Sequence, residues 1–216
     1  MEWTPIDEHT TRIFMIRHGE VENHDQGVFN GQLDVDITPR GVGHMERAAE
    51  FLAAGGGAGE TGETGVRRLY SSDLLRTVRG AAIISERLGL NETAQAVPDI
   101  REIHLGEWQG LSFEEVDDRF PGMRETRHAD IMNYRIPGSE TVAELSARVV
   151  PAVEEIAGRH RGESVAIVAH AGPNRTVLCH ALGLPLDRIF HIHQDYGAIN
   201  VLDFSAEGAV VRLMNG

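Results

Sequence analysis

Two short apolar runs that each end in a histidine constrain the fold of this chain more than any other feature. Residues 13–16 (Ile-Phe-Met-Ile) lead into Arg17, His18 and Gly19, and residues 164–169 lead into His170. Uninterrupted apolar runs of this length are typical of parallel strands that are buried on both faces. Ligands of open α/β sheets bind beyond the carboxyl ends of such strands. We therefore expect both histidines to lie in one catalytic site at the carboxyl edge of a sheet.

The segments around these runs show an alternation of helix and strand patterns. Helices are predicted over residues 38–52, 71–88 and 141–160 and again from Gly172, and further strands over 66–70, 94–100, 198–204 and 209–213. This alternation predicts an α/β fold. The last two strands should form a hairpin, and the proline-containing segment 94–100 should be an edge strand.

Capping residues and apolar spacing predict where two of these helices begin and which side chains they bury. Thr141 and Glu144 form a capping-box pattern at the start of the helix 141–160. In the helix 71–88, spacing predicts that Leu74, Leu75 and Val78 are buried. Arg76 falls in the first turn of that helix, near the carboxyl edge of the sheet.

Length favours one domain over residues 1–216. Within it, residues 1–10 are expected to be a loose leader. Residues 55–65 are rich in glycine and should form a flexible surface connection. Residues 112–134 are polar and look irregular, so we expect a surface insertion or partial lid there.

Charge and cysteine content limit the kinds of partner and the compartment that the sequence predicts. A formal net charge of -13 argues against nucleic acid or an anionic membrane as a partner. The single cysteine, Cys179, fits a reducing compartment. The chain lacks a signal-peptide pattern and any apolar run of membrane-spanning length. These features predict a cytoplasmic protein, and its late strands could pair across a homodimer.

Histidines beside arginines suit phosphoryl transfer. A neutral imidazole nitrogen can attack phosphorus and form a covalent phosphoenzyme that water later hydrolyses. Arginine can bind two oxygens of the transferred group at once. Arg17 adjoins His18, and Arg76 approaches from a helix start. A departing alkoxide also needs a proton, which a carboxyl group can supply.

Five motifs in order resemble the histidine phosphatase superfamily, also called the phosphoglycerate-mutase-like family. The hallmark of that family is Arg-His-Gly after the first strand, here residues 17–19. The other four motifs are residues 31–34 (Gly-Gln-Leu-Asp), 71–77 (Ser-Ser-Asp-Leu-Leu-Arg-Thr), 101–111 (Arg-Glu-Ile-His-Leu-Gly-Glu-Trp-Gln-Gly-Leu) and 168–172 (Val-Ala-His-Ala-Gly). The likeness covers about residues 11–204, and the ordered set is highly specific.

The resemblance implies a three-layer α/β/α sandwich with a mostly parallel sheet, a small phosphorylated metabolite as substrate, and neither a metal nor another cofactor. His18 would be the phosphorylated nucleophile, and Glu102 the general acid and then base, ahead of Glu107, Glu114 and Glu115. The phosphate pocket would be completed by Arg17, Arg76 and His170. Further candidates for contact with the phosphate are Asn23, His24, Asn30, Gly31 and Ala171. The family often has asparagine at the position of His24 and glycine at the position of Ala171.

Several alternatives stay open. Residues 101–108 resemble the phosphatase branch, which includes α-ribazole phosphatase-like proteins, so hydrolysis of a small phosphomonoester is predicted. A phosphoglycerate mutase and a non-catalytic module that binds a phosphorylated ligand are the alternatives. Surface or packing roles are favoured over a metal site for His191, His193 and Asp195. Ordinary surface charge is likewise favoured over a place at the pocket rim for Arg124, Arg127 and His128.

Overall fold

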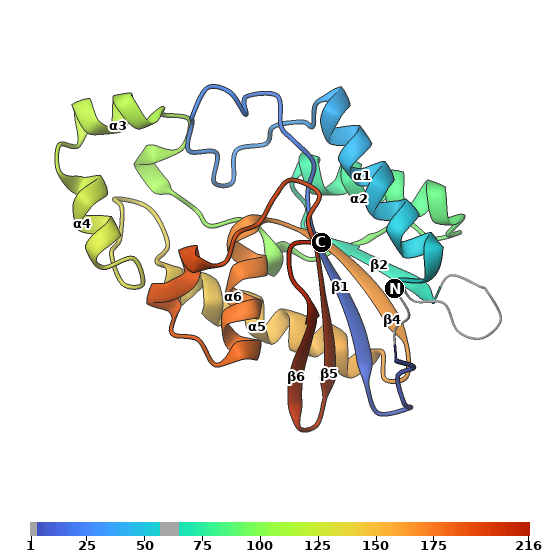
Figure 1. Cartoon of the computed structure of the whole chain (residues 1–216). Coiled ribbons are helices and arrows are strands. Elements are labelled where there is room, and N and C mark those ends of the chain that lie inside the picture. The colour runs from blue at the N-terminus through green and yellow to red at the C-terminus, as the bar shows by residue number, and fades with distance from the viewer. Residues whose placement is uncertain (1–3, 57–64) are drawn as a thin grey trace.

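The computed structural model describes residues 4–56 and 65–216, and within them it contains one six-stranded sheet in the order β3-β2-β4-β1-β5-β6 (Figure 1). The strands are β1 (Thr11–Arg17), β2 (Val66–Ser71), β3 (Gln95–Ala96), β4 (Ser164–Ala169), β5 (Ile199–Ser205) and β6 (Gly208–Leu213). Strands β1 to β4 run parallel. β5 pairs antiparallel with β1 and forms a hairpin with β6. The mostly parallel sheet was implied by the family resemblance, and the edge position of β3 and the closing hairpin were predicted from residue patterns. The strand predicted over 94–100 is shorter than expected, because β3 ends at Ala96 and residues 98–100 form the turn η2.

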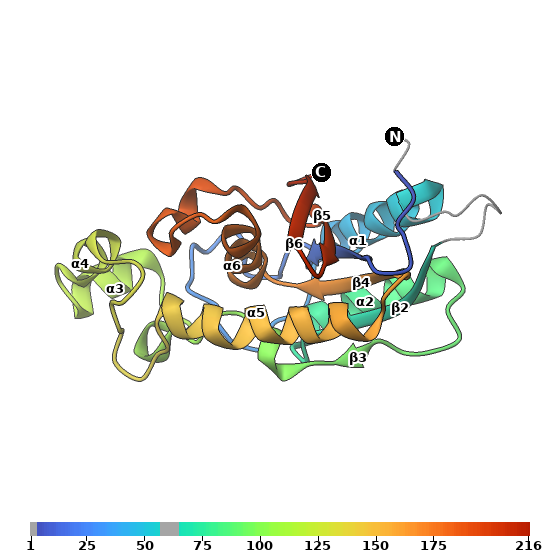
Figure 2. The ribbon, with the colours of Figure 1, turned by 90° about the horizontal axis from the view of Figure 1, so that it is seen from below.

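Helices cover both faces of this sheet, which confirms the three-layer sandwich (Figure 2). Helices α1 (Pro39–Phe51) and α2 (Leu75–Leu88) pack on one face, and α5 (Val142–Arg159) and α6 (Ala171–Leu182) on the other. β1 serves both layers because successive side chains of a strand point to opposite faces. Its Phe14 and Ile16 belong to the core with α1 and α2, whereas Ile13 and Met15 belong to the core with α5 and α6.

The segment 112–134 is more regular than expected. It contains α3 (Phe113–Arg119) and α4 (Met123–Ala129), at one end of the molecule in Figure 1. A capping box between Ser112 and Glu115 starts α3. Val116 then packs with Trp108 and Ile136 in a small separate core. The capping box and this packing explain why the polar segment 112–134 forms two helices. Its role as a lid stays a prediction.

The buried face of α2 was predicted incorrectly. The helix begins at Leu75, because β2 extends to Ser71 and Leu74 keeps an extended backbone. Leu75 and Val78 are 40% and 44% exposed, although Leu74 is buried. Arg76 points inward in their place. The predicted capping box of α5 is present, formed by Thr141 and Glu144.

Short helical turns and ends complete the chain. They are η1 (Leu52–Gly56), η2 (Pro98–Ile100), η3 (Gly106–Trp108) and η4 (Leu186–His191). Residues 4–10 contain neither helix nor strand, and the Thr4 carbonyl accepts a hydrogen bond from Arg12. Of the glycine-rich connection expected over residues 55–65, positions 57–64 lie outside the described residues. Among the helices of the described ranges, none is both long and apolar enough to cross a membrane.

Candidate active site

The carboxyl ends of β1 and β4 bring the two predicted histidines together. These strands are parallel neighbours in which Arg17 lies opposite Ala169. The backbone amide of His18 donates to the Ala169 carbonyl at 3.0 Å, so the chain stays paired into the site. The imidazole centroids of His18 and His170 are 5.2 Å apart. Both side chains are almost fully enclosed, since His18 is 5% and His170 0% exposed.

The surroundings of His18 keep its ring neutral. Burial lowers the pKa of His18 well below 6.5, and the charges of Arg76 and Arg17 lower it further. Nδ1 lies 2.7 Å from the Gly19 carbonyl oxygen, which can only accept, so the ring proton belongs on Nδ1. Nε2 therefore carries the free lone pair. A neutral imidazole with a directed lone pair is what nucleophilic attack requires.

Arg76 and His170 form a rigid unit. Arg76 donates from Nε to His170 Nδ1 at 3.3 Å, and from its two terminal nitrogens to the carbonyls of Leu33 and Gly31, at 2.7 Å each. His170 Nε2 lies 2.7 Å from Ser72 Oγ. A guanidinium has five N–H donors, so each terminal nitrogen of Arg76 keeps one for an anion. Burial lowers the pKa of Arg76 and, more strongly, that of His170.

Arg17 uses only some of its N–H donors in contacts with the described residues. One terminal nitrogen donates to the Gln194 carbonyl at 2.6 Å, and its guanidinium carbon lies 4.0 Å from the centroid of the Tyr196 ring. Its Nε is buried without a hydrogen-bond partner in the described part of the chain. Burial lowers the pKa of Arg17, although Tyr196 and Glu102 oppose this effect. A buried donor without a partner beside a histidine indicates a place for an anion.

Glu102 reaches the same site from the loop after η2. Its Oε2 accepts a hydrogen bond from the Gly172 amide at 3.3 Å, and its Oε1 accepts one from the Ile103 amide at 2.9 Å. Gly172 lies in the first turn of α6, directly after His170 and Ala171. A Cβ at position 172 would come within 2.2 Å of Glu102 Oε1. The absence of a side chain at Gly172 therefore lets Glu102 approach the start of α6.

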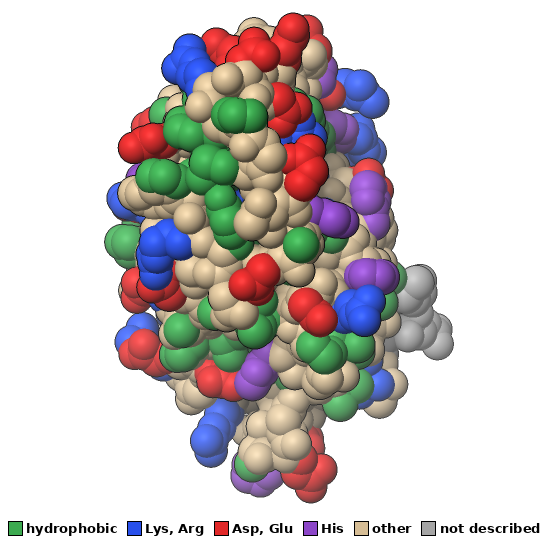
Figure 3. All heavy atoms as spheres, turned by 90° about the vertical axis from the view of Figure 1, so that its left-hand side faces the viewer, with side chains coloured by type: hydrophobic (Ala, Val, Ile, Leu, Met, Phe, Trp, Pro, Cys, Tyr) green, Lys and Arg blue, Asp and Glu red, His purple; other side chains and the backbone are tan. Residues whose placement is uncertain are grey.

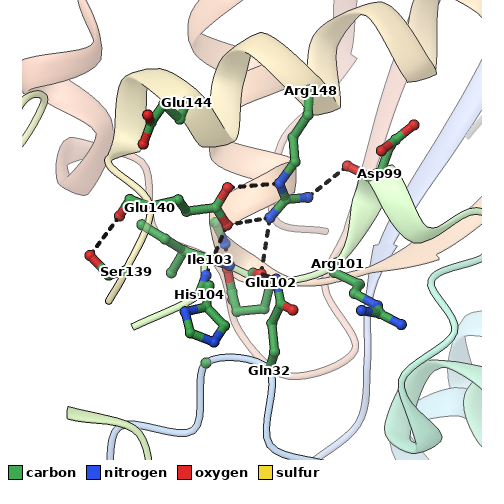
Figure 4. Close-up of polar contacts among 12 residues, drawn as sticks. Gln32, Asp99, Arg101, Glu102, Ile103, His104, Ser139, Glu140, Glu144 and Arg148 are labelled. Carbon is green, nitrogen blue, oxygen red and sulfur yellow. Dashed lines mark hydrogen bonds and ion pairs between the residues drawn. The ribbon is translucent and has the colours of Figure 1, made fainter. Parts of the chain in front are cut away.

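Another arginine, Arg148, fixes the loop that carries Glu102 (Figure 4). Arg148, on α5, donates to the backbone carbonyls of Asp99 and Glu102 at 2.7 and 3.0 Å. It also forms two hydrogen bonds with the Glu140 carboxylate, at 2.8 and 2.6 Å. Gln32 donates to the Glu102 carbonyl from the opposite side at 3.0 Å. The backbone of the loop is thus tied to α5 and to the segment before α1.

The remaining candidates differ in their surroundings. Asn23 and Asn30 exchange two amide hydrogen bonds, at 2.6 and 2.9 Å. The Gly31 carbonyl accepts from Arg76, at a backbone φ of 50°. His24 is exposed, and its Nδ1 lies 3.1 Å from the Val21 carbonyl. Ala171 is buried as the first residue of α6. Contact of any of them with a phosphate stays a prediction.

Residues 191–195 do not assemble a metal site. His193 pairs with Asp195 at 3.0 Å on the surface, and His191 is exposed at the end of η4. In residues 4–56 and 65–216, no three His, Cys, Asp or Glu side chains are grouped so that they could hold a metal ion.

Three contributors to the site were missed in the sequence. Ser72 lies inside a quoted motif, which was the available signal, but no role was assigned to it. Tyr196 and Arg148 carry no local signal, because their contacts join segments far apart in the chain.

An α/β sandwich with histidines and arginines gathered beyond two parallel strands is the arrangement that the resemblance to histidine phosphatases implies. Comparison with known families gives the same answer. The chain belongs to the histidine phosphatase superfamily (branch 1), which it matches over residues 13–216.

Similar proteins include several phosphatases. The chain is 28% identical over 204 residues to phosphoserine phosphatase 1 of Hydrogenobacter thermophilus, covering 94% of this chain and 92% of that one. It is 32% identical over 185 residues to glucosyl-3-phosphoglycerate phosphatase of Mycolicibacterium vanbaalenii, covering 82% and 76%. The solved structure of a mycobacterial glucosyl-3-phosphoglycerate phosphatase with VO3 superposes with a TM-score of 0.80 at 26% identity, covering 95% and 98%.

Some relatives are longer. The chain is 28% identical over 214 residues to a bifunctional protein of Mycobacterium tuberculosis, and it spans only 56% of that protein.

Proposed function

We propose that this protein hydrolyses a small phosphomonoester through a phosphohistidine formed on Nε2 of His18. The observation that carries the proposal is the state of His18: a buried, neutral ring whose Nδ1 is tied to the Gly19 carbonyl. Nε2 is left as the nucleophile, beside Arg17 and Arg76, which both retain N–H donors.

The reaction has two steps. In the first, the Nε2 lone pair attacks phosphorus, the bond from phosphorus to the leaving oxygen breaks, and Glu102 gives that oxygen its proton. In the second, Glu102 takes a proton from water, the water oxygen attacks phosphorus, and the bond to His18 breaks. Arg17 and Arg76 stabilise the equatorial oxygens in both steps. His170 completes the pocket and, through Nδ1, orients Arg76.

The other polar groups around the site have supporting roles in this proposal. The reciprocal pair of Asn23 and Asn30 presents amides toward the substrate, with His24 at its outer edge. Gly31 orients Arg76 through its carbonyl. Ala171 forms the wall beside His170.

The relatives favour a small, phosphorylated metabolite as substrate. Their names specify phosphoserine and glucosyl-3-phosphoglycerate. We extend to this chain only what these compounds share, which is a phosphate monoester of a small molecule.

Turnover of para-nitrophenyl phosphate in the presence of EDTA tests the mechanism. Wild-type protein should release nitrophenol, and His18→Ala should lose at least about a thousandfold in kcat, because the nucleophile is gone. His191→Ala, which changes an exposed histidine, is the matched control. Acid quenching should trap a phosphohistidine in the wild type only.

Two outcomes would contradict this mechanism: activity that survives in His18→Ala, or wild-type activity that the chelator abolishes. A mutase would instead isomerise 3-phosphoglycerate, so incubation with that compound should yield free phosphate and no isomer.

A further inference from the structure

A groove with aromatic walls lies beside α3 and α4, outside the site described above. Its volume is about 470 Å³. Aromatic side chains from three parts of the chain line it, namely Phe29, Trp108, Phe113 and Phe190. The Phe29 ring lies 5.2 Å from Trp108 and 4.8 Å from Phe113, centroid to centroid. Figure 3 shows this end of the molecule, where apolar side chains are exposed among charged ones. The walls suit a flat or apolar molecular body.

Arg127 places an uncompensated positive charge in this groove. It is half-buried and lines the groove, yet it has no hydrogen bond or ion pair with the described residues. Burial lowers the pKa of Arg127, and no charge on a described residue opposes that effect. Its neighbour Arg124 is different, because it pairs with Asp117 at 2.6 Å. Glu125 also lines the groove but is exposed and forms no ion pair with Arg127.

Arg127 differs from Arg17, Arg76 and Arg175, which also form no ion pair with the described residues but each donate to a backbone carbonyl. The chain has 33 acidic and 20 basic residues, so carboxylates are abundant. A partly buried charge is costly unless a partner compensates it. The missing partner is therefore best supplied by an anionic ligand, for which the planar guanidinium provides two parallel donors.

Side chains on α6 and η4 link the wall of the groove to the Glu102 side of the site. Gly172 contacts the Glu102 carboxylate, and Arg175 lies three residues further on the same face of the helix. Arg175 donates from Nε to the Ile192 carbonyl at 2.7 Å. Its guanidinium carbon lies 5.5 Å from the centroid of Phe190, which forms part of the groove wall.

We propose that this groove is the leaving-group subsite, and that Arg127 binds a carboxylate carried by an extended, aromatic or apolar leaving group. This inference rests on the proposed function, because Glu102 marks the leaving-group side only if it protonates the leaving oxygen. The substrate class is then a phosphate monoester of a hydroxy acid whose carboxylate is separated from the ester oxygen by a rigid or apolar body. Specificity arises at Arg127, and chemistry at His18.

A matched pair of substrates tests this subsite. Biphenyl-4-yl phosphate and its 4′-carboxylate differ in one distal charge, and the reacting bond is the same in both. Wild-type protein should favour the carboxylate by roughly tenfold in kcat/KM, which is typical for a hydrogen bond to a charged group. Arg127→Gln should remove this preference by raising KM for the carboxylate probe to the value for the uncharged probe. Arg127→Lys should retain part of it.

Arg119→Gln is the control, since it removes an exposed arginine of α3 that pairs with Glu115 and does not line the groove. Equal kcat/KM for the two probes in the wild type, or a preference that persists in Arg127→Gln, would overturn the subsite.

Failure of the proposed function can be distinguished from failure of the subsite. If the protein hydrolyses neither probe nor para-nitrophenyl phosphate, the chemistry is wrong. Calorimetric titration with 4′-hydroxybiphenyl-4-carboxylate, which has no phosphate, then tests the groove alone. Binding to the wild type that is weakened roughly tenfold in Arg127→Gln supports the subsite. Equal binding to both proteins, or binding to neither, rejects it.

Discussion

The proposed mechanism depends first on the protonation state of His18. An imidazole that is charged at neutral pH could not attack phosphorus. The fold prevents this by enclosing the ring and by placing Arg76 and Arg17 nearby, all of which lower its pKa.

This environment predicts the pH range of activity. Because the pKa of His18 lies well below 6.5, the ring should stay neutral as the pH falls through 6.5 and should become protonated only at lower pH. The acidic limb of kcat/KM, corrected for ionisation of the substrate, should therefore lie below 6.5. NMR titration of the imidazole, assigned by comparison with His18→Ala, checks the cause directly. Titration of this ring at or above 6.5 would contradict the expectation.

At this scale, the sequence was informative where a residue follows a recognisable strand or motif. Arg17, His18 and His170 were placed by buried strands, and Arg76 by a helix start. Tyr196 and Arg148 could not be placed, because nothing local distinguishes a tyrosine or arginine that contacts a distant backbone. Arg127 was interpreted as surface charge, and only the three-dimensional structure shows that it lines a groove and has no ionic partner among the described residues.

Among the elements, α5 has an effect on the site that its sequence pattern does not reveal. Apolar spacing accounts for its buried face, but Arg148 projects from it to hold the loop that carries Glu102 (Figure 4). A general acid contributes only while it is positioned at the leaving oxygen.

Loss of this support should impair acid catalysis selectively. Arg148→Met should lower kcat/KM about tenfold for substrates with poor leaving groups, out of the roughly 10²–10⁴-fold that a general acid supplies. Para-nitrophenyl phosphate should be much less affected, because its leaving group needs no proton. Glu102→Gln should show the same difference between substrates, and Arg148→Lys should recover part of the loss.

Arg159→Gln, on the same helix, is the control, because Arg159 is exposed and pairs with Glu155. Equal losses on both kinds of substrate would mean that Arg148 acts on stability alone.

The buried face of the element α2 was predicted incorrectly. Helical periodicity ranks positions by apolar character, and it placed Leu75 and Val78 inside. The structure buries Arg76 and Gly80 on that side. A position that serves the site can therefore override the apolar pattern of its own helix, and no periodicity rule anticipates this.

For the whole molecule, one buried ion pair joins the parallel and antiparallel parts of the sheet. Arg12 on β1 and Asp203 on β5 lie opposite each other and form two hydrogen bonds, at 2.7 and 2.8 Å. Arg212 on β6 donates to the same carboxylate at 2.8 Å. Burial alone would raise the pKa of Asp203, but the hydrogen bonds from both arginines outweigh it, so the pKa is lowered from 3.8.

Asp203→Asn should destabilise the protein by about 3–5 kcal/mol, because it breaks a buried ion pair by removing the carboxylate charge that Arg12 and Arg212 share. In the wild type this contribution is present above 3.8, the pKa of the unfolded chain, and is lost as the pH falls through the lower folded value. Urea unfolding at neutral and acidic pH measures both effects. The exposed pair of Glu155 and Arg159 provides the control, since Glu155→Gln should cost less than about 1 kcal/mol. A similar cost for the two variants would refute this account.

The general architecture was predictable because buried strands, caps and turns have local signatures. The order of the strands was not, because pairing such as that of Arg12 with Asp203 joins positions 191 residues apart. The three layers came from a resemblance to a family and were confirmed by the helices on both faces of the sheet.

The start of α6 links the two halves of the proposed chemistry. His170 contacts Arg76 on the proposed phosphate side, and two positions later the amide of Gly172 donates to Glu102, the proposed proton donor. The first turn of α6 therefore fixes the positions of both His170 and Gly172. A shift of α6 along its axis would move the groups that contact Arg76 and Glu102 together. A change on the phosphate side of the site would therefore disturb the leaving-group side as well. Variation in substrate preference should therefore accumulate in the surrounding segments and leave this turn unchanged.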